Sequence, residues 1–345
     1  MAVGKKNVTI NDIAKRGGVS KVTVSYVLNN RQTGVRISEA TRTRVLSLAQ
    51  EMGYHPNALA RGLARRQTDT LALVMQYPAV FSGWSGFINE LMHGASDAAS
   101  ALGYDLMLHT KAQVGIEREV AALTDGRVDG VLILRDRDDP LAERLSEAEF
   151  PFVQIFSRPR LPHAPFVDCD NVTGGRMATE HLIRLGHRRI GHIAGSQSSV
   201  AASHRFQGYC GALATHSLPF SPDWVCQVSY EGGDFAPLLA MMQRAEAPTA
   251  LFAWSDDVAI KAMRLLRQEL GKSVPGDVAI VGYDGTLICE HIQPALSSVR
   301  QPIYEMSGQA VRMLVDTIQG RPIETPHALF TPILDVRGSC GGFLT

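Results

Sequence analysis

The chain has 345 residues, of which 45% are apolar and 20% charged, a composition that excludes a disordered protein and suggests two or three folded units. No apolar run approaches the roughly 18 residues of a membrane span, and no apolar stretch follows Lys5 and Lys6 as a secretory signal requires, so we expect a cytoplasmic protein with no membrane partner. The net charge is zero, but residues 1–70 hold 12 Lys/Arg against 4 Asp/Glu and the remainder holds 22 against 30. A basic segment on an acidic body indicates a polyanion-binding module, unless it is only a basic tail.

Residues 9–53 carry the pattern of three short helices. Thr9 is placed to cap the first, with Asp12 in position to complete a capping box. Ser20 and Ser38 are placed to cap the second and third. The apolar residues expected to face a common core are Ile10, Ile13, Ala14, Val24, Val27, Leu28, Val45, Leu48, Ala49 and Met52. Two short helices joined by a glycine turn and braced by a third are typical of a helix-turn-helix unit.

From residue 70 onward, short apolar runs alternate with segments of helical spacing. The expected strands are 71–75, 104–108, 128–134, 152–156, 189–194, 250–253 and 278–283. The expected helices include 86–102, 172–186, 202–216 and 256–271. Because parallel strands need crossover connections, this alternation predicts an α/β fold with parallel sheets.

The first sixty residues resemble the opening of the LacI/GalR family of transcription regulators. The resemblance is carried by VTINDIAKRGGVSKVTVSYVLN at 8–29, by SEATRTRVL at 38–46 and by GYHPNALARGL at 53–63. It implies a helix-turn-helix DNA-binding domain at 1–55, a hinge helix or linker at 56–69, and an effector-binding and dimerisation domain at 70–345. By the same resemblance, that last domain consists of two doubly wound parallel α/β subdomains of the periplasmic-binding-protein type. Their expected bounds are about 70–168 with 303–330, and about 169–302 with 331–345.

Operator contacts follow from the resemblance and from the chemistry of the second helix. The residues expected to touch DNA are Thr9, Ser20, Lys21, Val22, Thr23, Ser25, Tyr26, Asn29, Asn57, Ala60 and Leu63. A helix presented by a turn fits the major groove, where Lys21, Val22 and Tyr26 are expected to meet base edges. Many family members carry Arg where this chain has Tyr26, so their operator preference cannot be transferred. The alternative is that Lys21 and Tyr26 are ordinary surface residues.

The segment from 57 to 64 resembles the family's hinge helix. The resemblance implies that two such helices from a homodimer enter the minor groove and that Leu63 wedges between base pairs. Gly62 makes this segment a poor helix on its own, so it can order on DNA and act as a switch. The alternative is a plain basic linker that Arg61, Arg65 and Arg66 keep solvated.

The body resembles the family's effector domain at five segments. These are DCDNVTGG at 168–175, HLIRLGHRRIGHIAG at 181–195, RFQGY at 205–209, PTALFAWSDD at 248–257 and VAIVGYD at 278–284. The effector contacts that we expect are Trp84, Ser85, Phe87, Phe156, Arg205, Ser255, Asp257 and Asp284. Polar groups at the carboxyl ends of parallel strands suit a polyhydroxylated ligand in a cleft, and aromatic faces can stack on a sugar ring.

Alternatives remain open for several of these residues. The aromatic residues near 84–87 could belong to a helix-packing core, Arg205 could form a structural salt bridge to Asp256, and Asp284 could serve a turn. Phe156 is a large apolar group where the lactose repressor has a polar contact, which changes the pocket. The neighbouring aromatic position falls at either Val228 or Tyr230.

Signatures of enzymes and metal sites are absent from the sequence. No G-x-S-x-G, GxxxxGK, HExxH, G-x-G-x-x-G or CxxC occurs, and His181, His187 and His192 fall on different predicted elements, so we expect no catalysis, no metal and no cofactor. The five cysteines are expected to be reduced and buried.

We therefore expect a bacterial, nucleoid-associated repressor of a carbohydrate uptake or catabolism operon, controlled by a sugar or sugar derivative. The alternatives are a sugar-binding transport protein and an architectural DNA binder without ligand control. No apolar heptad tail follows residue 338, so we expect a dimer rather than a tetramer.

Overall fold

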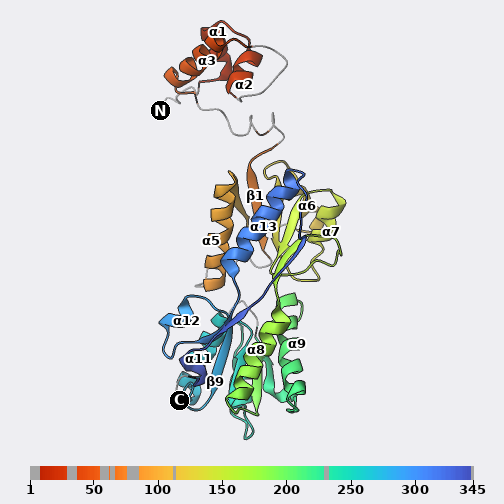
Figure 1. Ribbon diagram of the computed structural model, residues 1–345, viewed down its shortest axis with the longest axis vertical. Coiled ribbons are helices and arrows are strands. Elements are labelled where there is room, and N and C mark those ends of the chain that lie inside the picture. Colours follow the sequence, from red (N-terminus) through yellow and green to blue (C-terminus); the bar gives the residue numbers. More distant parts are fainter. Residues whose placement is uncertain are drawn as a thin grey trace. The chain divides into compact units, whose positions relative to one another are not determined.

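The computed structural model describes residues 8–28, 37–54, 62, 67–75, 85–111, 114–228 and 233–342. The chain divides into two compact units, Met1–Asp69 and Thr70–Thr345, which are coloured along the sequence in Figure 1. Within the described residues, every helix is too short or too polar to traverse a lipid bilayer.

The first unit contains three helices, α1 (Ile10–Gly17), α2 (Lys21–Leu28) and α3 (Glu39–Glu51). The predicted capping box is present, because the backbone N–H of Thr9 donates to the Asp12 carboxylate at 2.8 Å. The core consists of Ile13, Val24, Val27, Val45 and Ala49, and other apolar residues pack around it. Val24 and Val27 are buried in this core and the partly buried Leu28 packs against it, as predicted.

The second unit contains two six-stranded sheets, and the predicted fold class is confirmed. The first sheet has the order β11-β5-β4-β3-β1-β2, with β1 (Thr70–Met75), β2 (Asp105–His109), β3 (Gly130–Leu134), β4 (Phe152–Ile155), β5 (Phe166–Cys169) and β11 (His327–Phe330). The second has the order β12-β10-β9-β8-β6-β7, with β6 (Ile190–Ala194), β7 (Val225–Gln227), β8 (Ala250–Ala253), β9 (Ala279–Asp284), β10 (Ser297–Arg300) and β12 (Ile333–Asp335). All described strand pairs are parallel except that of β12 with β10.

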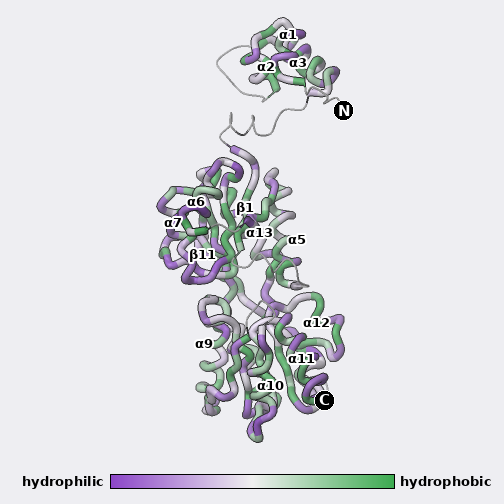
Figure 2. Tube along the Cα trace, turned by 180° about the vertical axis from the view of Figure 1, so that it is seen from behind, coloured by the Kyte–Doolittle hydropathy of each residue, from purple (hydrophilic) through white to green (hydrophobic). Residues whose placement is uncertain are grey.

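Helices cover the sheets. They are α5 (Gly86–Ala101), α6 (Ile116–Leu123), α7 (Leu141–Glu147), α8 (Asn171–Arg184), α9 (Val200–Thr215), α10 (Ala236–Met242), α11 (Asp256–Leu270), α12 (Ile288–His291) and α13 (Ile303–Ile318), with short 3₁₀ turns at Pro222–Trp224 and Gly338–Cys340. In Figure 1, α5 and α13 lie side by side against the first sheet, and their apolar faces share its core. Green and purple segments alternate along the helices in Figure 2, as expected for helices with one buried face.

The chain passes between the two sheets three times. It leaves the first sheet after β5, returns through α13 to β11, and crosses again to β12. Each subdomain is therefore built from segments that are distant in the sequence, and three stretches of chain connect the two subdomains.

Helices α8 and α9 pack with their backbones in close approach. A Cβ atom on Gly175 of α8 would lie 2.2 Å from the carbonyl oxygen of Arg205, and one on Gly208 of α9 would lie 2.1 Å from that of Val172. These distances are shorter than any van der Waals contact, so only glycine permits the packing. The packing fixes the position of α9, which carries Arg205.

We expect Gly208→Ala to lower the stability of the second unit by about 1–3 kcal/mol, because the two helices must separate to admit a methyl group. The matched control is Gly211→Ala on the same helix, where an added Cβ meets no atom within 4 Å. There the higher helix propensity of alanine should raise stability by up to about 1 kcal/mol. Thermal unfolding followed by circular dichroism measures both, and shifts of the same sign in the two variants would contradict the close packing.

Candidate functional site

The first turn of α2 presents the residues that the sequence selected for base contacts. Lys21 is exposed, and the Val22 side chain is 56% exposed although it is apolar. Ser20 caps the helix, since its hydroxyl oxygen accepts the Thr23 backbone N–H at 3.0 Å. Tyr26 lies on the next turn and is partly buried. The described surface thus combines an exposed cation, an exposed aliphatic group and the N-terminus of a helix, which is a suitable surface for a DNA groove.

The rest of the predicted DNA set divides into described and undescribed residues. Thr9 is exposed at the start of α1, and Thr23 and Ser25 are partly buried on α2. The predictions for Asn29, Asn57, Ala60 and Leu63 lie outside the described residues, as do those for Trp84 and Tyr230.

Arg205 is the centre of the predicted effector site. Its guanidinium Nη1 lies 3.5 Å from Asp284 Oδ1, and both side chains are nearly fully buried. The Nε atom donates to Asn171 Oδ1 at 2.9 Å, and the guanidinium carbon lies 3.6 Å from the centre of the Tyr283 ring. Nη1 also donates to the backbone carbonyl of Trp254. The structure therefore brings α8, α9, β9 and the end of β8 together around one cation.

The salt bridge that was considered between Arg205 and Asp256 is not the one that forms. Asp256 instead accepts hydrogen bonds from the backbone N–H of Thr286 at 2.9 Å, from the Thr286 hydroxyl at 3.1 Å and from the Ser298 hydroxyl at 2.5 Å. Asp256 thus ties α11 to the loop after β9 and to β10, and Asp284 is the carboxylate that is left for Arg205.

Ser255 and Asp257 flank that buried aspartate. The Ser255 hydroxyl caps α11 by accepting the backbone N–H of Val258 at 3.4 Å. The half-buried Asp257 carboxylate accepts a hydrogen bond from the Ser85 hydroxyl. Because Ser85 precedes α5 in the first subdomain and Asp257 lies on α11 in the second, this hydrogen bond connects the two subdomains.

Three further contacts join the subdomains. The Ser198 hydroxyl donates to Asp136 Oδ2 at 2.6 Å, and the backbone N–H of Arg137 donates to the Ser198 carbonyl at 3.2 Å. A Cβ on Gly86 would lie 2.6 Å from the Cβ of Thr286, so α5 begins in direct contact with the loop after β9. The two subdomains therefore contact each other where Ser198 meets residues 136–137 and where Gly86 meets Thr286.

The electrostatics of the site are dominated by carboxylates. Burial raises the pKa of Asp256 to about 6, and burial also raises the pKa of Asp257. Burial raises the pKa of Asp284 well above its ordinary range, although Arg205 opposes this effect. Of these three carboxyl groups, only that of Asp284 pairs with the guanidinium of Arg205.

Two aromatic residues of the predicted site, Phe87 and Phe156, pack against each other. Phe87 and Phe156 make an edge-to-face contact with ring centres 4.7 Å apart, and both pack into the core of the first sheet. Phe156 has a φ of 54°, an unusual conformation for a bulky residue. Val228, which was one of two candidates for a stacking position, is 1% exposed.

Several neighbours of Arg205 were missed by the sequence reading. Asn171, Tyr283 and the Trp254 carbonyl contact the guanidinium, and Gln301 Nε2 donates to Asp284 Oδ1 at 2.8 Å. Asn171 and Tyr283 stood inside the segments that carried the family resemblance and could have been included. Gln301 follows β10, and no local sequence pattern indicates that it belongs to the site, because its partner Asp284 is distant in the sequence.

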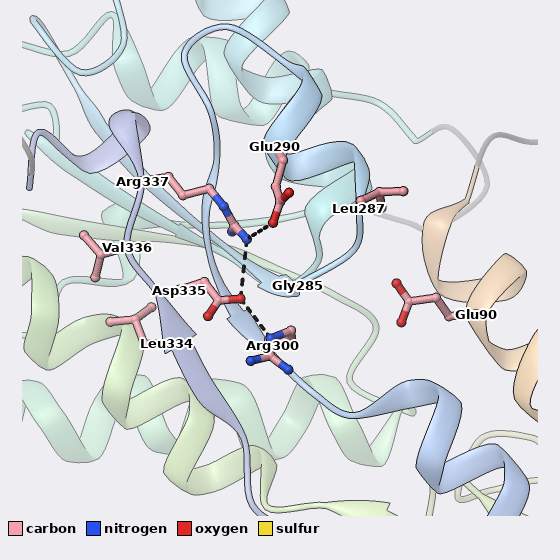
Figure 3. Close-up of a pocket in the computed structure, with 9 residues that line it drawn as sticks. All are labelled: Glu90, Gly285, Leu287, Glu290, Arg300, Leu334, Asp335, Val336 and Arg337. Atoms are coloured by element: carbon pink, nitrogen blue, oxygen red, sulfur yellow. Dashed lines mark hydrogen bonds and ion pairs between the residues drawn. The ribbon is translucent and has the colours of Figure 1, made fainter.

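A separate cavity of about 720 Å³ lies beside α5, α12 and β12. Its polar and rim residues include Glu90, Leu287, Glu290, Arg300, Asp335 and Arg337 (Figure 3). Arg337 contacts Glu290 at 3.0 Å and Asp335 at 3.4 Å, and Arg300 contacts Asp335 at 2.9 Å. None of the predicted effector residues is among the residues that line this cavity.

Metal ligands do not gather in the part of the chain that the structure describes, where no group of three His, Cys, Asp or Glu side chains could hold an ion. The five cysteines are free, and all except the partly buried Cys210 are buried. Burial raises the pKa of the Cys169 thiol to about 12, so this thiol is unreactive.

Comparisons with known proteins match both units. Residues 9–57 match the family described as bacterial regulatory proteins, lacI family, and residues 179–340 match a periplasmic binding protein-like domain. The HTH-type transcriptional regulator CelR of Thermobifida fusca is 38% identical over 342 residues, which cover 97% of this chain and 99% of that protein. A solved structure of a CelR–cellobiose complex is 37% identical with a TM-score of 0.73, over 96% of this chain and 100% of that one. The lac repressor dimer bound to operator and an anti-inducer is 26% identical with a TM-score of 0.82, over 97% and 99%.

We expect Arg205→Met to lower the stability of the second unit by about 3–5 kcal/mol, because it leaves the buried Asp284 without its cation. Asp284→Asn in the same chain should recover part of that loss, since an amide has no charge to compensate. Urea unfolding of the wild type, both single variants and the double variant gives the coupling between the two residues. If the two losses simply add, the pair does not stabilise the site.

Proposed function

The chain belongs to the LacI family of bacterial regulatory proteins, and from this premise we propose that it is a homodimeric repressor of a carbohydrate uptake or catabolism operon. It is a DNA-binding transcriptional regulator, as its relatives are, and those relatives are regulators rather than enzymes. In this proposal it acts in the bacterial cytoplasm, at the nucleoid, and needs neither a metal nor a cofactor.

The observation that carries the DNA-binding part is the exposed first turn of α2. Lys21 and the 56% exposed Val22 stand where a helix enters the major groove. A dimer would place two such helices on two half-sites of one operator. Residues 56–69 are proposed as the hinge, with Leu63 as the minor-groove wedge.

The effector part rests on the cluster around Arg205. Asp284, Ser255 and Asp257 supply acceptors for ligand hydroxyls beyond strands β8 and β9, and Ser85 reaches them from the other subdomain. A ligand that replaces the Ser85–Asp257 hydrogen bond changes the relative position of the two subdomains. We propose that this change in subdomain position alters the affinity of the protein for its operator. The relative whose structure holds cellobiose supports a sugar or sugar derivative as the ligand.

The proposed function predicts a preferred operator and a ligand that changes affinity for it. Selection from random duplexes with the purified chain identifies the operator, and titrations with and without a sugar panel that begins with cellobiose measure the response. A change of about 5- to 150-fold is expected, the usual range of allosteric coupling. A preferred operator whose affinity no panel member alters would indicate an architectural DNA binder, and no sequence preference at all would end the proposal.

Val22→Ala is expected to reduce the preference for the operator over unrelated DNA roughly tenfold, because one apolar base contact is lost. Non-specific affinity should stay unchanged, since Val22 cannot contact phosphates. Leu46→Ala is the matched control, because Leu46 is 47% exposed on α3 of the same unit and is not a proposed contact. Equal effects of the two substitutions in a titration against both DNAs would remove Val22 from the base-reading set.

A further inference from the structure

We propose that the cavity beside α5, α12 and β12 binds a small organic cation with an ammonium group at each end of an alkyl chain, a linear diamine or polyamine. This inference goes beyond the proposed function and does not depend on it, because none of the predicted effector residues lines the cavity. It follows from the size of the cavity, from the partners of its charged residues and from the aliphatic residues that accompany them.

The cavity has the size of a small-molecule site and is lined by both subdomains. Its volume of about 720 Å³ falls within the range of about 300–1,000 Å³ that is usual for ligand pockets. Glu90 comes from α5 of the first subdomain, and every other lining residue comes from the second. A molecule that fills this cavity therefore contacts both subdomains.

Glu90 carries a charge that no partner compensates. Within the part of the chain that the structure describes, its half-buried carboxylate takes part in no hydrogen bond and no ion pair. Burial raises the pKa of Glu90, and the charges of Asp256 and Glu305 raise it further. Arg300 and His93 lower it, but each has a smaller effect. An ammonium group beside Glu90 would offset the cost of keeping this carboxylate ionised.

The two arginines of the cavity are already paired. Arg337 contacts Glu290 at 3.0 Å and Asp335 at 3.4 Å, and Arg300 contacts Asp335 at 2.9 Å. In Figure 3 these ion pairs lie on the side of the cavity toward which the Glu90 carboxylate points. Two guanidinium groups thus face three carboxylates, and the lining keeps one net negative charge.

Glu290 offers a second acceptor in the same cavity. Its Oε1 atom accepts the hydrogen bond from Arg337, and its side chain is 57% exposed. The Oε2 atom therefore remains accessible to a donor on a ligand. Glu90 and Glu290 come from different subdomains, so a molecule with a donor at each end can reach both.

The arrangement of these groups indicates the class of cation. Within the described residues, no three acidic, histidine or cysteine side chains come together closely enough to hold a metal ion, so the lining suits separated charges better than one compact ion. Leu287, Leu334 and Val336 also line the cavity, and an alkyl chain can pack against them. A linear diamine has this pattern, because its ammonium groups lie at the ends of an alkyl chain and each can donate to a carboxylate.

The experiment measures binding to the full chain in the absence of DNA. Isothermal titration calorimetry compares putrescine, cadaverine and spermidine with the uncharged diol of the same chain length as putrescine and with magnesium chloride, all at matched ionic strength. We expect at least one amine to bind at least about tenfold more tightly than the diol and Mg²⁺, because hydrogen bonds to charged groups are the stronger ones.

Two results of this titration would overturn the inference. One is that none of the amines binds, and the other is that the diol or Mg²⁺ binds as tightly as the best amine. Either result leaves the proposed regulator intact, because neither the operator nor a sugar enters the experiment.

Variants test whether Glu90 is responsible. Glu90→Gln removes the charge and keeps the size of the side chain, so affinity for the best amine should fall about tenfold or more. Because Glu90 has no partner to lose within the described residues, this variant should unfold at the wild-type temperature or higher, which separates lost binding from lost folding. Glu269→Gln removes a carboxylate from the exposed end of α11 and should leave the affinity unchanged. Wild-type affinity in Glu90→Gln, or an equal loss in both variants, would show that the assignment is wrong.

Discussion

A single buried guanidinium organises the larger unit. Arg205 binds Asn171 on α8, Asp284 at the end of β9 and the carbonyl that follows β8, and it rests on the ring of Tyr283. Removing a charge of this kind from water is costly unless every donor finds a partner. The partners must therefore be held in place, and the glycine-mediated packing of α8 on α9 does this. The rest of the site is arranged around this requirement.

As a consequence, the three neighbouring aspartates bind different partners. Asp284 compensates the positive charge of Arg205, and Asp256 accepts hydrogen bonds from Thr286 and Ser298. Asp257 accepts a hydrogen bond from Ser85 of the other subdomain. The first two aspartates bind partners within the second subdomain, and the third contacts the first subdomain.

The first unit meets a different constraint. Its core is small, with five buried side chains, and its helices are only 8 to 13 residues long. Helices of this length are only marginally stable on their own. The caps at Thr9, Ser20 and Ser38 therefore make an important contribution to the stability of this unit. The exposed Val22 at the start of α2 lies outside that core.

The sequence by itself determined whatever depends on neighbours along the chain. The three caps, the helix-turn-helix core and seven of the strands followed from local spacing, and each of those strands lies within one or two residues of its expected position. The strands β5, β7, β10, β11 and β12 were not predicted, because each has only three or four residues and is stabilised by pairing with other segments of the chain. Family resemblance selected Arg205, Asp257 and Asp284, but only the tertiary structure decided that Arg205 pairs with Asp284 and not with Asp256. The physical reason is that helical and strand periodicity places a side chain on a face, whereas its partner comes from whichever distant strand the fold brings to that face.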